Sequence, residues 1–147
     1  METKIPPPIV TLIFIFLIAF SNRIVEPFSF EFQIPLGVAI IICGLSVLIL
    51  AVRVFKQLET TINPMQPSQA SKLAITGPFE FTRNPMYLGM SIMLIGFGVI
   101  FGAKLTICLL ALFVIYITIF QIIPEERAME KKFDNWEDYS AKVRRWL

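Results

Sequence analysis

Apolar residues are gathered into four long runs, with the polar residues between and after them. The runs cover residues 5–22, 34–52, 84–103 and 105–124, and each run is free of Asp, Glu, Lys and Arg. A helix needs roughly 20 apolar residues to cross the ~30 Å hydrocarbon core of a bilayer. The pattern therefore predicts an all-α, polytopic membrane protein in which a single domain, residues 1–147, has four transmembrane helices.

The first run is the weakest of the four. Its prolines, Pro6 to Pro8, belong at a helix entrance and not in a helix interior. The dense apolar part, residues 9–20, is as short as the core of a secretory signal peptide. The preceding Lys4 is offset by Glu2, which is a poor charge pattern for a signal peptide. A membrane span is therefore favoured, and a cleaved signal peptide is the alternative.

Composition agrees with a membrane protein and excludes several kinds of site. Charged residues make up 16% of the chain, against about 25% in a typical soluble domain. The chain has no His, which excludes Ser-His-Asp triads and His-ligated zinc. Cys43 and Cys108 both lie within apolar runs, so we expect no disulfide and no metal site. The net charge of +2 is too small to indicate a nucleic acid partner.

The basic residues divide unequally between the two sides of a four-span arrangement. The side that holds the N-terminus, a loop at 53–83 and a tail at 125–147 carries eleven Lys and Arg, and the other side carries two, Arg23 and Lys104. The positive-inside rule places the richer side in the cytoplasm. We therefore expect an integral protein of a bacterial inner membrane with both termini cytoplasmic.

The last two runs form the most clearly defined unit. Only Gly102–Lys104 joins them, which predicts an antiparallel helical hairpin. The third run is rich in glycine, including Gly98 and Gly102 four residues apart, a spacing that lets helices approach closely. In the tail, Trp136, Tyr139, Val143 and Leu147 recur at helical spacing beside basic residues, which predicts an amphipathic helix on the anionic inner leaflet.

Two polar clusters flank this hairpin at its cytoplasmic end. One leads into the third run and contains Arg83, Asn84 and Tyr87; the other follows the fourth run and contains Glu125 and Glu126. Each has a structural explanation by itself: Arg83 as a snorkelling residue, Tyr87 as an interfacial aromatic, the glutamates as charges at a helix start. The hairpin would bring them together, and a polar cluster at the mouth of apolar helices is the default hypothesis for a binding site.

The order of the short motifs resembles a known family. The pieces are Gly77–Phe79, Arg83–Gly89, Pro124–Arg127 and Phe133–Trp146, and residues Thr61 to Pro67 also look like small bacterial members. Together they resemble the superfamily of integral membrane methyltransferases that includes isoprenylcysteine carboxyl methyltransferases and phospholipid N-methyltransferases. The resemblance implies an S-adenosylmethionine-dependent enzyme that holds its cofactor at the cytoplasmic end of the last two spans.

The resemblance also implies roles for individual residues. Residues 75–77 would line the adenine with backbone groups. Arg83, Asn84 and Tyr87 would meet the methionine moiety, and the two glutamates would hold its ammonium or the ribose hydroxyls. The cofactor-binding residues would be Ile75, Thr76, Gly77, Arg83, Asn84, Pro85, Tyr87, Glu125 and Glu126. The catalytic residues would be Arg83, Glu125 and Glu126. Carboxylates suit the cations of the cofactor, and an arginine suits its carboxylate.

The methyl acceptor is expected to be membrane-soluble or a small hydrophobic molecule, with membrane lipids around it. The nearest label is an isoprenylcysteine carboxyl O-methyltransferase, and a phospholipid (ethanolamine) N-methyltransferase is the alternative. A hypothesis of another class is a non-catalytic membrane scaffold that packs through the glycine-rich third run.

Overall fold

The computed structural model describes residues 5–59 and 71–147, and these residues form helices without any β-strand. The expected all-α fold is therefore confirmed for the described part of the chain. Lys4 and the motif from Thr61 to Pro67 lie outside the described residues. The longer elements are α1 (Pro7–Ser21), α2 (Gln33–Gln57), α3 (Pro85–Phe101), α4 (Thr106–Ile117) and α5 (Ile123–Lys132). The shorter ones are the 3₁₀ turn η2 (Gly77–Glu80), the π-helical turn η3 (Thr118–Ile122) and α6 (Trp136–Lys142).

Each of the four apolar runs forms a helix, but the helices differ in length. Helix α2 and the continuous stretch Thr106–Lys132 are long and apolar enough to cross a membrane. Helices α1 and α3 are shorter, at 15 and 17 residues. Length and composition thus identify two candidate spans among the described helices, and the arrangement with four spans stays a prediction.

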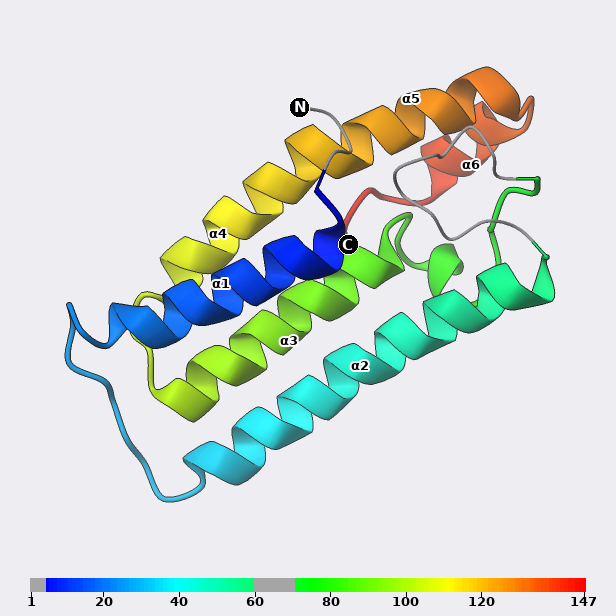
Figure 1. The fold of residues 1–147 in the computed structure, drawn as a ribbon. Coiled ribbons are helices and arrows are strands. Elements are labelled where there is room, and N and C mark those ends of the chain that lie inside the picture. The colour runs from blue at the N-terminus through cyan, green and yellow to red at the C-terminus, as the bar shows by residue number, and fades with distance from the viewer. Residues whose placement is uncertain (1–4, 60–70) are drawn as a thin grey trace.

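Helix α3 is the central element of the bundle because it contacts α1, α2 and α4 (Figure 1). Its contact with α2 depends on pairs of facing glycines. A Cβ added to Gly44 would lie 2.6 Å from the carbonyl oxygen of Gly89, and one added to Gly37 would lie 2.8 Å from that of Gly96. The two backbones are therefore in direct contact, which only glycine permits.

The hairpin predicted for the third and fourth runs is present. Helix α3 ends at Gly102, which adopts a left-handed conformation with φ of 65°. The Ala103 amide then donates to the carbonyl of Gly98 at 2.9 Å, which closes the turn before α4 begins. The next helix returns along α1 and α3.

Pro124 does not interrupt the helix that follows α4. The chain passes from α4 through the π turn of η3 into α5, and Pro124 occupies an early position of α5, where a missing N–H is tolerated. A π turn contains one extra residue and changes the direction of the side chains after it. Glu125 and Glu126 therefore project from a helix that continues the fourth apolar run.

Two sequence-based boundaries are wrong. The loop expected at 53–83 begins later because α2 continues to Gln57, where Ala51 and Val54 pack against Ala74 and Phe79. The amphipathic helix expected through Leu147 ends at Lys142, and the chain is extended at Val143, with φ of −113° and ψ of 130°. Competing hydrogen bonds to the start of α3, described below, hold residues 143–147 out of the helix.

The polar elements gather at one end of the bundle. The start of α1, the end of α2, the start of α3, and α5 with α6 all lie at this end, whereas the α1–α2 connection and the α3–α4 turn lie at the other (Figure 1). The two polar clusters of the sequence therefore lie at the same end of the molecule.

Candidate active site

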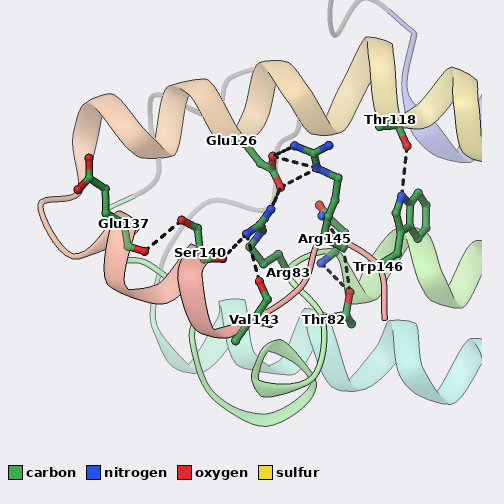
Figure 2. A network of polar contacts seen from close by, with 10 residues as sticks. Thr82, Arg83, Thr118, Glu126, Glu137, Ser140, Val143, Arg145 and Trp146 are labelled. Atoms are coloured by element: carbon green, nitrogen blue, oxygen red, sulfur yellow. Dashed lines mark hydrogen bonds and ion pairs between the residues drawn. The ribbon is translucent and has the colours of Figure 1, made fainter.

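Glu126 is bound by two arginines that come from distant parts of the chain. Arg83 Nη2 lies 3.0 Å and Arg145 Nη2 2.6 Å from its carboxylate oxygens. The Nε atoms of Arg83 and Arg145 donate to the same carboxylate, at 3.1–3.2 Å. Figure 2 shows the Glu126 carboxylate between the two guanidinium groups. The start of α3, the start of α5 and the end of the chain are joined at this point.

Arg83 also fixes the position of α6. Its Nη1 donates to the carbonyl oxygens of Ser140 and Val143, at 2.7 and 3.1 Å (Figure 2). Its guanidinium lies 5.8 Å from the centroid of the Trp136 ring. The side chain is 13% exposed. Arg83 is therefore an internal, multiply bonded residue of the protein, and not a side chain that reaches for the membrane surface.

Residues 143–147, called here the C-terminal segment, cross over the start of α3. The Arg83 amide donates to the carbonyl of Arg144 at 2.9 Å. The side chains of Thr82 and Asn84 both donate to the carbonyl of Arg145, at 3.2 and 2.9 Å. One backbone bond and two side-chain bonds therefore hold the C-terminal segment against residues 82–84.

Trp146 attaches the C-terminal segment to the apolar helices. Its indole Nε1 donates to Thr118 Oγ1 in η3 at 3.2 Å (Figure 2). Its ring packs against the core that contains Tyr87, Met90 and Ile122. The tail therefore contacts the protein itself at the buried aromatics Trp136 and Tyr139 and at Trp146.

Glu125 has different partners from Glu126. Tyr87, from the first turn of α3, donates its hydroxyl to Glu125 Oε1 at 2.5 Å. Arg83 and Arg145, which pair with Glu126, are not bonded to Glu125. The adjacent glutamates thus have different surroundings: two arginines bind Glu126, whereas the partly buried Glu125 accepts from Tyr87.

The segment before α3 is placed by its aromatic residue. Phe79 of η2 packs edge-on against Phe55 of α2, with the ring centroids 5.2 Å apart. The carbonyl oxygen of Phe79 accepts a hydrogen bond from the Tyr139 hydroxyl at 2.8 Å. Ile75, Thr76 and Gly77 are exposed beside it. The Gly77 amide donates to Glu80 Oε1 at 3.0 Å, so this N–H is engaged within its own turn.

Two groups outside the apolar helices have shifted pKa values. Burial raises the pKa of Tyr139 to about 12, with the positive Arg83 opposing and the negative Glu126 adding to the shift. The hydrogen bonds to Glu126 raise the pKa of Arg145 above its ordinary value. The hydroxyl of Tyr139 and the charge of Arg145 are therefore constant across physiological pH.

The structure brings together five of the residues expected at the site: Arg83, Asn84, Tyr87, Glu125 and Glu126. Pro85 is buried at the start of α3, and residues 75–77, which lead into η2, are exposed. Their functional roles stay predictions. Sequence reasoning missed Arg145, because the tail was expected to be helical through Leu147 and its basic residues were interpreted as contacts of an amphipathic helix with the anionic inner leaflet.

Comparison with known proteins identifies the family. The family model described as "Phospholipid methyltransferase" matches residues 32–135, which cover most of the chain. The chain belongs to the phospholipid methyltransferase family. This family is part of the membrane superfamily of isoprenylcysteine and phospholipid methyltransferases, so the predicted resemblance is confirmed. The matched range contains all five residues that the structure brings together.

Other comparisons add less. A Haemophilus influenzae protein described as uncharacterized is 38% identical over 63 residues, which are 42% of this chain and the whole of that protein. No solved structure matches the chain. Membership of a phospholipid methyltransferase family and two long apolar helices indicate a membrane-associated protein. Within the described residues, no three His, Cys, Asp or Glu side chains are grouped as a metal site would require.

Proposed function

We propose that the chain is an S-adenosylmethionine-dependent methyltransferase of a bacterial inner membrane, with both termini in the cytoplasm and a lipid-like or small hydrophobic acceptor. The observation that carries the proposal is the polar cluster of Arg83, Tyr87, Glu125 and Glu126 at one end of apolar helices, in a chain of this family. A scaffold that packs only through α2 and α3 has no need of such a cluster at the helix ends.

The donor set fits the charges of the proposed cofactor. The cofactor has cationic groups and a carboxylate, and carboxylate and guanidinium groups are their usual partners. Glu125 is the better candidate for the cations because it is bonded to Tyr87 and not to the two arginines that bind Glu126. Glu126 is already bound by Arg83 and Arg145, so its role is to hold these two arginines.

Bound S-adenosylmethionine would supply an electrophilic methyl group. The chain's own contribution is to align the reactants and exclude water. Arg83 supports the site by joining α3 to α5 and α6. If the acceptor is an amine, Glu125 is placed to accept its proton; a carboxylate acceptor needs no base.

The position of the cluster suits reactants from two phases. A polar cofactor arrives from water, and a prenyl or acyl chain arrives from the bilayer. The cluster lies where α3 and α5 begin, next to the apolar face formed by α3 and α4. Both proposed acceptors, a prenylcysteine carboxylate and a phospholipid amine, would enter the site from the bilayer.

Two measurements test the proposal. Purified protein should bind S-adenosylhomocysteine in a calorimetric titration, whereas a scaffold protein would not. Membrane extracts incubated with methyl-labelled cofactor should then yield a labelled lipid. Mild alkali releases label from a carboxyl ester but not from a methylated amine, so the alkali step separates the prenylcysteine from the phospholipid acceptor. No binding and no labelled product would overturn the proposal.

A further inference from the structure

The group formed by Arg83, Glu126 and Arg145 carries a surplus positive charge. The formal charges of these two guanidinium groups and one carboxylate sum to +1. Glu125 does not cancel this charge directly, because it is bonded to Tyr87 and to neither arginine. A surplus positive charge in a partly buried place favours an anionic partner.

The surplus charge is presented by Arg145 and not by Arg83. Every nitrogen of the Arg83 guanidinium donates to Glu126, Ser140 or Val143, and the side chain is 13% exposed. Arg145 uses Nε and Nη2 for Glu126, whereas its Nη1 makes no hydrogen bond within the described chain. Its side chain is 39% exposed. The edge of Arg145 that faces away from Glu126 therefore has free N–H donors.

Arg145 also lies at the boundary between the polar and apolar parts of the molecule. The next residue, Trp146, packs on the apolar core and bonds to Thr118 within the fourth apolar run. The carbonyl of Arg145 itself is held by Thr82 and Asn84 at the polar start of α3. The guanidinium is thus fixed by its backbone and by Glu126, which is what a preorganised anion site needs.

We propose that Arg145 is an anion-binding residue of this site, oriented by Glu126, and that it binds a carboxylate or phosphate group of a ligand. The inference deepens the proposed function and rests on it. Two sources would provide the group: the amino-acid carboxylate of the cofactor or the phosphate of a membrane lipid. Arg83 is then a positioning residue, because its donors are used within the protein.

The test compares Arg145→Gln with the matched control Arg144→Gln. Arg144 is exposed and adjacent, and only its backbone carbonyl takes part in the contact with Arg83. In Arg145→Gln the Arg83–Glu126 ion pair remains, so the fold should persist. Calorimetry would measure binding of S-adenosylhomocysteine and of methylthioadenosine, which lacks the amino-acid group. Thermal melts in nanodiscs would compare the melting temperature of each protein with phosphatidic acid and with diacylglycerol, which lacks the phosphate.

Each source predicts a different result. If the cofactor carboxylate is bound, Arg145→Gln weakens the binding of S-adenosylhomocysteine by about tenfold or more and leaves the affinity for methylthioadenosine unchanged. If a lipid phosphate is bound, the variant loses the stabilisation that phosphatidic acid gives over diacylglycerol. Arg145→Lys should retain part of either effect, because it keeps the charge and loses the planar fork.

Several outcomes would overturn the inference. One is that Arg145→Gln changes neither the binding of S-adenosylhomocysteine nor the stabilisation by phosphatidic acid. Others are an equal loss in Arg144→Gln, or tighter binding of S-adenosylhomocysteine by Arg145→Gln. Loss of methylthioadenosine binding in Arg145→Gln as well would show a purely structural role. Failure of the proposed function is distinct from these, because the wild-type chain would then bind neither nucleoside, and the lipid comparison would still test Arg145.

Discussion

Two neighbouring glutamates have different environments because consecutive helical residues point about 100° apart. Glu126 points toward the C-terminal segment, where two arginines bind it, and Glu125 points toward α3, where Tyr87 donates to it. Glu126 is therefore part of the protein's internal ion network, and Glu125 is the glutamate that we propose for a cationic group of the cofactor. The two residues should respond differently to the same substitution.

Glu125→Gln should weaken the binding of S-adenosylhomocysteine by about tenfold or more, because a hydrogen bond to a charged group contributes roughly 1.5–3 kcal/mol. The melting temperature should change little, since the glutamine carbonyl can still accept from Tyr87. Calorimetry with S-adenosylhomocysteine and with methylthioadenosine, which lacks the ammonium, measures the effect. Glu130→Gln, exposed one turn further along α5, is the matched control. Equal binding by wild type and Glu125→Gln would contradict the assignment.

Tyr139 gives the site end of the molecule a dependence on alkaline pH. Its pKa in the folded protein is about 12, above the ordinary value near 10 for an exposed tyrosine. A pKa raised by folding stabilises the fold below pH 10, and this contribution is lost as the pH rises to 12. Tyr139→Phe lacks the contribution and also lacks the bond to the carbonyl of Phe79.

We expect Tyr139→Phe to be less stable than wild type by about 1 kcal/mol at pH 8, and the difference to shrink between pH 10 and 12. Denaturant titrations of both proteins at each pH measure it. Other tyrosines and lysines titrate in both proteins, so the comparison removes their effect. A difference that stays constant through this range would contradict the prediction.

At the residue scale, the sequence predicted which side chains would meet but not how they would pair. Arg83, Tyr87 and the two glutamates could be placed together because a short turn forces the third and fourth runs into a hairpin. Arg145 could not be placed, since its position depends on hydrogen bonds to residues 82–84 that are far away in sequence. Local periodicity contains no information about such bonds.

At the scale of elements, glycines decide how α2 and α3 meet. The sequence drew attention to Gly98 and Gly102, but these serve the turn between α3 and α4. The helix contact is made by Gly89 and Gly96, which are seven residues apart and face Gly44 and Gly37 of α2. Seven residues are about two helical turns, so both pairs lie on one line of contact. Sequence alone could not choose among the glycines without knowing which helix packs against α3.

Gly44→Val should therefore separate α2 from α3. The added side chain would meet the carbonyl oxygen of Gly89, and overpacking of this kind costs typically 1–3 kcal/mol. Because α2 also positions η2 through Phe55 and Phe79, binding of S-adenosylhomocysteine should weaken together with the melting temperature. Ala39→Val places the same side chain on the exposed face of α2 and should change neither. Equal melting temperatures for the two variants would show that the glycine contact is not needed.

At the scale of the whole molecule, most basic residues lie at the end of the bundle that holds the site. Arg23 follows α1 and Lys104 lies in the α3–α4 turn, and the bond from Asn22 to the carbonyl of Phe101, at 2.7 Å, holds these two regions together. The other described basic residues lie near the end of α2 or after it, at the start of α3, in α5, in α6 and in the C-terminal segment. The end of the bundle that is poor in positive charge is thus opposite the end that holds the site.

This distribution of charge predicts the orientation of the protein in the inner membrane that we propose for it, because the end rich in Lys and Arg stays in the cytoplasm. A fluorescent protein fused after Leu147 should be fluorescent, and alkaline phosphatase fused at the same place should be inactive. Phosphatase inserted after Lys104, in the α3–α4 turn, should be active if α3 crosses the membrane despite its 17 residues. Activity after Leu147 with silence after Lys104 would reverse the orientation. Silence of phosphatase at both places would instead show that α3 and α4 form a hairpin that does not cross, and the cofactor would then have to reach the site from the same side as that turn.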